Sequence, residues 1–262
     1  SLCEDNSGAI WAGCSNGLYC VRKSQAGVSR FDNSWLNGVP VRQMCCDRNG
    51  ILWIPRNGND LLQVNTVTGH VTTLPVDCKS ICVTCTGTVY VLTKEDCLMV
   101  SSDGQKDLEP VSSEIDRILF NQGVSRMVCA AGRLFLSSGE GAPFVLDLAT
   151  HQISKVNFLS KMRDVLEHTS GELWVAARDG IHILDSCLVQ KRVFRPYHDN
   201  SFRCLAQDHK GGVWGGTLFE GLARICPNNL NFRHYSEEFT GGGSFKARDF
   251  VEDAKGYIWV GS

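Results

Sequence analysis

The sequence predicts an all-β protein, a β-propeller of four-stranded antiparallel blades, on three observations. A glycine followed three positions later by a large aromatic residue recurs seven times in 262 residues. These aromatic residues are 42, 37, 45, 39, 40 and 45 residues apart, and turn-forming residues recur every 8 to 12 residues, with no stretch that predicts a helix. A period of about 40 residues made of short strands is typical of propeller blades. The aromatic residues are Trp11, Trp53, Tyr90, Phe135, Trp174, Trp214 and Trp259.

The fifth repeat shows the pattern of one blade most clearly. Residues rich in β-formers alternate with polar turns that contain glycine, as expected of short antiparallel strands. The third segment alternates apolar and polar residues, which suits a half-buried strand. The four predicted strands lie at about residues 163–167, 172–177, 181–185 and 191–196.

The turn before each aromatic residue has its own signature. An aspartate lies three positions before the glycine in four repeats, at Asp5, Asp47, Asp208 and Asp253. This spacing predicts a tight turn in which the carboxylate accepts backbone N–H groups and the glycine adopts a positive φ. We expect the aromatic residue that follows to pack between neighbouring blades.

The even repeat favours one domain over residues 1–262, with an incomplete last repeat. We expect seven blades, with the seventh completed by sequence outside this chain. In the alternative, six blades close the ring, and the last strands pack at the junction between the first and the last blade. The chain starts and stops inside a repeat, which suggests a piece of a longer sensor. The approximate repeats are 1–38, 39–78, 79–124, 125–161, 162–200, 201–242 and 243–262.

Composition narrows the function classes. A formal net charge of −2 gives no reason to expect nucleic acid or an anionic membrane as partner. No run of about 18 apolar residues predicts insertion into a membrane, and the N-terminus does not resemble a signal peptide.

Thirteen cysteines are scattered along the chain, and most are interpreted as small buried hydrophobic residues. The named examples are Cys20, Cys82, Cys129, Cys204 and Cys226. The Cys82 and Cys85 pair could suggest zinc, but side chains alternate along a strand, so the two would point to opposite faces. We expect no metal and no cofactor.

Two stretches carry a family resemblance: residues 208–217 with Gly221 and Leu222, and residues 253–262. Both resemble the two-component regulator propeller repeat, which forms the periplasmic sensor region of hybrid two-component histidine kinases of Bacteroides-type bacteria. The likeness is strong in repeats 1, 2, 5, 6 and 7, and weaker where Tyr90 and Phe135 replace tryptophan. It implies an extracytoplasmic sensor of polysaccharide-derived oligosaccharides, in the periplasm as part of an inner-membrane protein. It also implies a downstream β-sandwich domain and a kinase domain that lie outside this chain. The chain itself would then not be an enzyme.

A cation recurs eight residues before the motif glycine in five repeats. If the blades are equivalent, these cations begin the first strands and form a ring that attracts an acidic oligosaccharide or another small anionic ligand. In the alternative interpretation they tie one blade to the next through carbonyls or acidic residues such as Asp164 and Asp249. The five cations are Arg42, Lys79, Arg163, Arg203 and Arg248.

Loop residues that do not repeat are the candidates for selectivity, because function is often carried by loops on a rigid scaffold. They combine aromatic faces with hydrogen-bonding groups, as recognition of a sugar requires. Exposed aromatic residues equally fit a contact to a neighbouring domain or to a second copy in a homodimer. The candidates are Trp35, Arg56, Asn57, Asp60, Arg178, Asp179, Tyr197, His198, Phe219 and Glu220.

Two other function classes stay open. One is a scaffold that binds only protein. The other is an enzyme similar to the streptogramin lyases, which would need histidine, a carboxylate and a divalent metal around one substrate. Only His198 is well placed for that chemistry, so catalysis is the weaker alternative.

Overall fold

The computed structural model describes residues 1–22, 27–56, 60–101, 107–139, 141–159, 161–235 and 246–261. The chain forms two compact units, Ser1–Met127 and Val128–Ser262. Strands dominate both units, and every sheet is antiparallel with its strands in chain order along the sheet. Within the described residues there are six four-stranded sheets and one two-stranded sheet.

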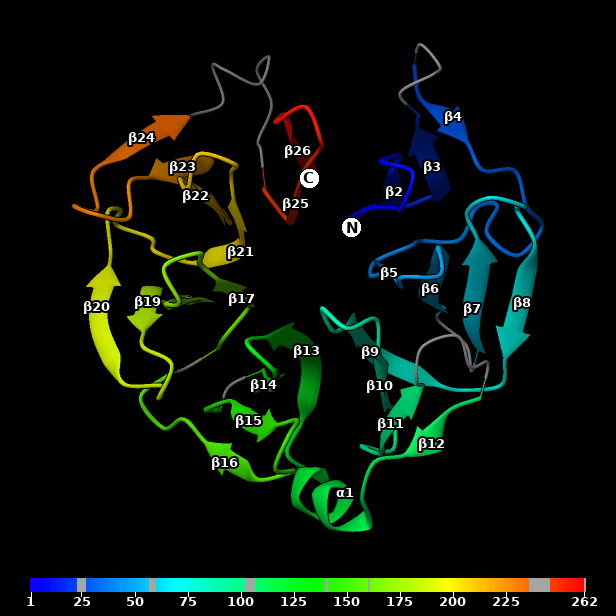
Figure 1. Ribbon diagram of the computed structural model, residues 1–262, viewed down its shortest axis with the longest axis horizontal. Coiled ribbons are helices and arrows are strands. Elements are labelled where there is room, and N and C mark those ends of the chain that lie inside the picture. Colours follow the sequence, from blue (N-terminus) through cyan, green and yellow to red (C-terminus); the bar gives the residue numbers. More distant parts are fainter. Residues whose placement is uncertain are drawn as a thin grey trace. The chain divides into compact units, whose positions relative to one another are not determined.

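The first unit contains three four-stranded sheets, drawn from blue to green in Figure 1. The first is β1 (Leu2–Glu4), β2 (Ile10–Cys14), β3 (Gly17–Val21) and β4 (Ser29–Arg30). The second is β5 (Cys45–Cys46), β6 (Ile51–Arg56), β7 (Asp60–Asn65) and β8 (Val71–Leu74). The third is β9 (Cys78–Val83), β10 (Val89–Thr93), β11 (Leu98–Ser101) and β12 (Glu109–Pro110), followed by the helix α1 (Ser113–Leu119).

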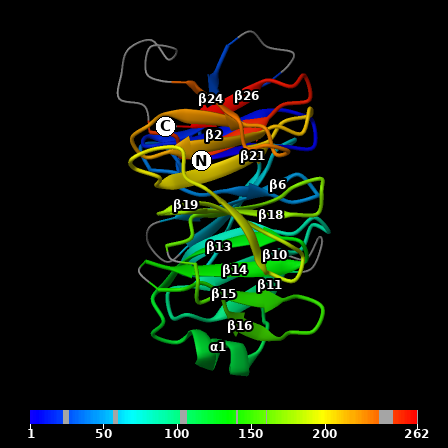
Figure 2. The same cartoon turned by 90° about the vertical axis from the view of Figure 1, so that its left-hand side faces the viewer.

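The second unit contains the remaining sheets; the boundary between the units falls within β13. Figure 2 shows β13 to β16 following one another in chain order. The strands are β13 (Val124–Ala130), β14 (Arg133–Ser138), β15 (Phe144–Asp147) and β16 (Ile153–Lys155). The next sheet is β17 (Asp164–Glu167), β18 (Leu173–Ala177), β19 (Gly180–Leu184) and β20 (Gln190–Phe194). Then follow β21 (Phe202–Gln207), β22 (Val213–Thr217), β23 (Leu222–Ile225) and β24 (Phe232–Tyr235), with the two-stranded sheet β25 (Asp249–Glu252) and β26 (Ile258–Gly261).

The four strands predicted for the fifth repeat are confirmed, each within about two residues at its ends. Trp174 of β18 lies opposite Leu166 of β17 and Ile183 of β19. Gly180 opens β19 with φ +139°, and a Cβ there would lie 2.7 Å from the Phe194 carbonyl oxygen. Only glycine fits this position, because the backbone of β20 passes so close.

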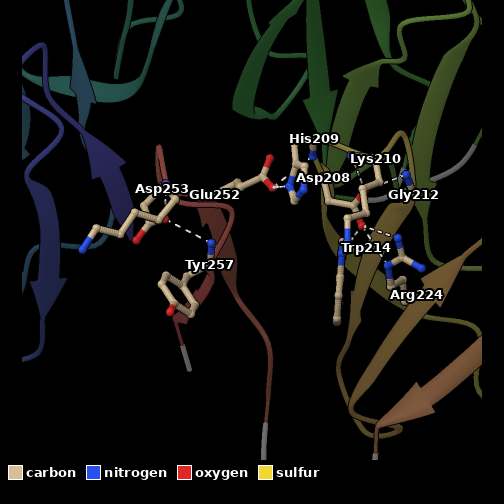
Figure 3. Close-up of polar contacts among 10 residues, drawn as sticks. Asp208, His209, Lys210, Gly212, Trp214, Arg224, Glu252, Asp253 and Tyr257 are labelled. Carbon is tan, nitrogen blue, oxygen red and sulfur yellow. Dashed lines mark hydrogen bonds and ion pairs between the residues drawn. The ribbon is translucent and has the colours of Figure 1, made fainter.

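The predicted aspartate turns are confirmed, and they do more than the sequence indicated. In each, one carboxylate oxygen accepts backbone N–H groups, and the other accepts the indole N–H of the tryptophan six residues later. Asp208 Oδ1 accepts from the Gly212 N–H at 2.8 Å, and its Oδ2 accepts from Trp214 Nε1 at 3.0 Å, as Figure 3 shows. The carboxylate therefore fixes the turn and the aromatic side chain together. The pairs are Asp5 with Trp11, Asp47 with Trp53, Asp208 with Trp214 and Asp253 with Trp259.

Five of the seven recurring aromatic residues, Trp11, Trp53, Phe135, Trp174 and Trp214, pack between successive sheets, as predicted. Trp11 lies in one apolar cluster with Leu52 and Ile54 of the following sheet. Trp174 lies with Val213 and Ile225 of the following sheet and has no exposed surface. Burial of such large side chains gives these pairs of sheets within a unit a shared core.

The expectation that the chain has no helix was wrong for residues 113–119. The Ser112 hydroxyl caps the helix by accepting the Glu114 N–H, and acidic residues in the first turn favour its N-terminus. Ile115 and Leu119, four residues apart, are buried on one face. The helix is too short for its periodicity to stand out in the sequence.

No helix in the described part of the chain has the length and apolar character needed to cross a membrane.

Candidate functional site

A groove in the second unit brings together four of the predicted loop residues. Its volume is about 510 Å³, and it is formed by three segments: the turn between β18 and β19, the connection from β20 to β21, and the loop between β22 and β23. The lining residues are Arg178, Asp179, Arg195, His198, Asp199, Asn200, Ser201, Leu218 and Phe219. The predicted candidates among them are Arg178, Asp179, His198 and Phe219.

Hydrogen bonds fix the shape of the connection from β20 to β21. Asn200 Oδ1 accepts the Tyr197 N–H at 3.0 Å, and the Asp199 carboxylate accepts the Ser201 N–H at 2.9 Å. The Ser201 carbonyl in turn accepts the Leu218 N–H at 3.1 Å, which joins this connection to the loop that carries Phe219. Such short side-chain-to-backbone bonds hold a loop without regular secondary structure.

Asp179 is the centre of a charged network at one wall of the groove. Its Oδ2 accepts from Arg195 Nη2 at 2.6 Å, its carbonyl accepts from Arg195 Nε at 2.6 Å, and its Oδ1 lies 2.9 Å from Nε2 of the buried His182. Burial alone would favour the neutral acid, but the hydrogen bonds from His182 and Arg195 outweigh it and lower the pKa of Asp179. The carboxylate is therefore ionised and already engaged on two sides.

Three lining residues have open side chains, meaning exposed side chains without a hydrogen-bond or ion-pair partner among the described residues. Arg178 and His198 are exposed, and among the described residues no hydrogen bond or ion pair engages either side chain. Phe219 is 61% exposed. The groove thus offers one open guanidinium, one open imidazole and one open aromatic face.

Tyr197 and Glu220 lie beside the groove rather than in its lining. The Tyr197 ring packs in an aromatic cluster with Phe202, Phe232 and His234. Burial, with a smaller contribution from the Glu220 carboxylate, raises the pKa of the Tyr197 phenol to about 12. Tyr197 is therefore a neutral phenol that packs in this aromatic cluster, outside the lining of the groove.

The first unit brings three further candidates together. The Arg56 guanidinium lies 5.2 Å from the centre of the Trp35 ring and forms an ion pair with Asp60. The Trp35 ring is 44% exposed. Asn57 lies outside the described residues. This arrangement holds Arg56 in a cation–π and ion-pair contact within the protein.

The five recurring cations occupy different settings. Lys79 Nζ pairs with Oδ1 of Asp96, which lies in the turn between β10 and β11 of the same sheet. Arg42 and Arg248 are exposed just before β5 and β25, whereas Arg163 just before β17 and Arg203 within β21 are half-buried. A role in ligand binding stays a prediction for all five.

Two acidic residues connect successive sheets of the second unit through hydrogen bonds to the backbone. Asp164 Oδ2 accepts the Leu205 N–H at 2.8 Å, and Glu252 Oε1 accepts the His209 N–H at 3.0 Å (Figure 3). A partnership between Asp164 and an arginine stays a prediction. The Asp164 carboxylate also joins β17 to the backbone of β21 directly.

The described residues contain no group of three or more His, Cys, Asp or Glu side chains that could hold a metal ion. Cys20, Cys82 and Cys204 are buried, as predicted, and Cys129 is half-buried. The prediction was wrong for Cys226, which is exposed because it follows β23 at the start of a turn instead of lying inside a strand.

Repeating four-stranded antiparallel sheets that share aromatic cores define the class of the β-propellers. The predicted all-β propeller is confirmed, and the count of seven blades stays a prediction. The chain is similar over its whole length to the extracellular domain of BT3049 from B. thetaiotaomicron, described as a hybrid two-component system, with a TM-score of 0.77 and 15% identity. It spans 38% of the length of that chain.

Two other solved structures are as similar. A streptogramin B lyase has a TM-score of 0.77 and 12% identity over 99% of this chain and 89% of its own. The WD40 β-propeller domain of Doa1 has a TM-score of 0.76 and 12% identity over 100% of this chain and 88% of its own. No protein-family model and no curated protein matches the sequence. Since such similarity shows the fold alone, the function must be argued from the site.

Sequence reasoning missed Arg195, Asp199, Asn200, Ser201 and Leu218 as lining residues. The run His198 to Ser201 is a polar turn of the kind that connects strands, and that composition was the available signal.

Proposed function

We propose that this chain is the ligand-sensing propeller of an extracytoplasmic two-component sensor, and that the groove around Phe219 binds an oligosaccharide. The groove is the observation that carries the proposal. Its open aromatic face, guanidinium and imidazole stand on bonded loops, and sugars are recognised by ring stacking together with hydrogen bonds to hydroxyls. The fold similarity to the extracellular domain of BT3049 supports the sensor class.

The signal would pass to domains outside this chain by a population shift. The ligand must bind one arrangement of neighbouring parts more tightly than another, because a ligand with equal affinity for both shifts nothing. We also infer seven blades. The register of β25 and β26, with Val251 opposite Trp259, repeats that of β17 and β18, with Leu166 opposite Trp174, as expected of the first half of a further blade.

The test is titration calorimetry of the chain against a panel of neutral and acidic oligosaccharides, repeated with Phe219→Ala. We expect binding of at least one member and a loss of about 10-fold in affinity on removal of the ring. The matched control is Phe120→Ala, because Phe120 is 60% exposed at the end of α1, away from the groove residues in the sequence.

Two results would contradict the proposal. If no sugar binds and the chain instead captures a defined protein, the scaffold is the better interpretation. If the chain opens a streptogramin ring only when a divalent metal is added, it is a lyase. Loss of affinity in Phe120→Ala equal to that in Phe219→Ala would show that the groove is not the site.

A further inference from the structure

The groove contains two guanidinium groups in different states. The Arg195 guanidinium is committed to Asp179 through both Nε and Nη2. Arg178, one residue before Asp179 in the chain, has no such partner among the described residues. The groove therefore has one neutralised cation and one open cation.

Asp179 would be the simplest partner for Arg178, but its carboxylate is directed elsewhere. One oxygen is 2.9 Å from His182 Nε2 and the other is 2.6 Å from Arg195 Nη2. His182 is held from its other side, because its Nδ1 lies 2.7 Å from Gln190 Oε1. The Asp179 carboxylate is thus paired with His182 and Arg195, and among the described residues it forms no ion pair with Arg178.

The other open groups suit a sugar more than a simple anion. Phe219 offers an exposed ring for the C–H face of a pyranose, and His198 offers a ring nitrogen for hydroxyls. Asp199 uses one carboxylate oxygen to accept the Ser201 N–H, and its other oxygen can accept from a hydroxyl. A volume of about 510 Å³ accommodates more than one sugar ring.

We propose that the groove recognises an acidic oligosaccharide, with the carboxylate of a hexuronate residue on Arg178 and the same or the adjacent ring on Phe219. Planar guanidinium groups bind carboxylates through two parallel hydrogen bonds, which gives selectivity for the acid over the neutral sugar. This assignment rests on the proposed function, since it names the ligand class of the same groove.

The experiment compares acidic oligosaccharides with the same molecules after chemical reduction of their carboxylates to alcohols. Oligomers of galacturonate, glucuronate and mannuronate are titrated into the 262-residue chain by calorimetry. We expect at least one acid to bind, and reduction to weaken it about 10- to 100-fold. Arg178→Ala should produce a similar loss for the acid and little change for the reduced sugar. Arg178→Lys should restore only part of the affinity, because a lysine cannot form the paired bonds.

The control is Arg117→Ala, which removes an exposed arginine on α1 and should leave affinity unchanged. Equal binding of acid and reduced sugar, or an unchanged affinity of the acid in folded Arg178→Ala, overturns the hexuronate assignment but leaves a sugar-binding sensor. Absence of binding by every acidic and neutral oligosaccharide overturns both. Circular dichroism of each variant distinguishes a lost contact from a lost fold.

Discussion

Two turns at the same position of successive sheets share a backbone hydrogen bond but begin with different side chains. In the sheet of β21 to β24 the turn begins with Asp208, and in the sheet of β17 to β20 it begins with His168. Each residue stands six positions before the tryptophan of its repeat. Both turns close with the same backbone bond, from the glycine N–H to the carbonyl of the first residue, at 2.8 Å.

The two side chains make different contacts. Asp208 binds within its own sheet, to the Trp214 indole at 3.0 Å and to Arg224 Nε at 2.8 Å (Figure 3). His168 Nδ1 accepts the Ser170 N–H, so a neutral ring carries its proton on Nε2 and donates it to the Gly211 carbonyl of the next sheet at 3.1 Å. Among the described residues, buried Trp174 Nε1 has no hydrogen-bond partner.

The backbone conformation of this turn therefore does not depend on the aspartate. Where the aspartate is present, it anchors the tryptophan, and Asp208 also pairs with Arg224. Where histidine replaces it, the side chain ties one sheet to the next, and the tryptophan is held by the apolar cluster and the His168 ring without a hydrogen bond. A buried N–H group without an acceptor lowers the stability of the folded state by about 1–3 kcal/mol. An acceptor for the Trp174 indole would therefore stabilise the sheet whose turn begins with His168.

The largest effect expected is that of Trp174→Ala. Trp174 is fully buried in the core shared with the next sheet, whereas Trp214 is half-buried. Removing Trp174 should lower the free energy of unfolding by about 3–5 kcal/mol, and removing Trp214 should cost less. Guanidinium denaturation followed by circular dichroism measures both. A larger loss for Trp214→Ala would mean that the bond to Asp208 outweighs burial.

The next effect is that of Asp208→Ala, which removes the acceptor for the Gly212 N–H, the Trp214 indole and Arg224 at once. We expect a loss of about 2–3 kcal/mol, because several donors are left without their partner. His168→Ala should cost less, since it removes uncharged hydrogen bonds to Ser170 and Gly211 and the ring contact to Trp174. Equal losses in the two variants would contradict the comparison.

The pH dependence of Asp208 gives an independent check. Burial favours the neutral acid, but the Gly212 N–H, Arg224 and Trp214 outweigh it and lower the pKa of the Asp208 carboxyl. Such a group stabilises the folded state above its unfolded pKa of about 3.9, and this stability is lost as the pH falls through the folded pKa. Between about pH 5 and pH 2 the wild type should therefore lose more stability than Asp208→Asn.

The smallest expected effect is that of His168→Asp, which tests the role of the indole N–H directly. His168→Asp supplies an acceptor for Trp174 Nε1 and gives up the bond to the Gly211 carbonyl. We expect a net gain of about 1 kcal/mol. In a Trp174→Phe background, which has no indole N–H, the gain should disappear. A gain that persists there would have to come from another source.

Much of the fold could be predicted from sequence because the signals are local. The glycine with positive φ, the aspartate that accepts the N–H groups after it, and the alternation of strands are fixed by neighbours in the chain. The bond from Asp208 to the Trp214 indole was missed because it depends on the direction of a large side chain, although the spacing of six residues was visible. The helix α1 was missed because seven residues carry too little periodic pattern.

The site could be predicted only in part. Arg178, Asp179, His198 and Phe219 were chosen because they lie in loops without repeating character, and the structure brings them into one groove. The sequence could not show that Asp179 is engaged by Arg195, since the two are sixteen residues apart and meet only through the pairing of β19 and β20. Their pairing decides which arginine is open.

The connection from β20 to β21 links two successive sheets covalently, and it also forms a wall of the groove. An occupant would touch a turn of each sheet and the segment that joins them. Because the two sheets share a buried apolar core, these three surfaces are held at fixed positions, so the groove would admit only an occupant whose length fits between them. The same groove could in this way report the size of a molecule as well as its charge.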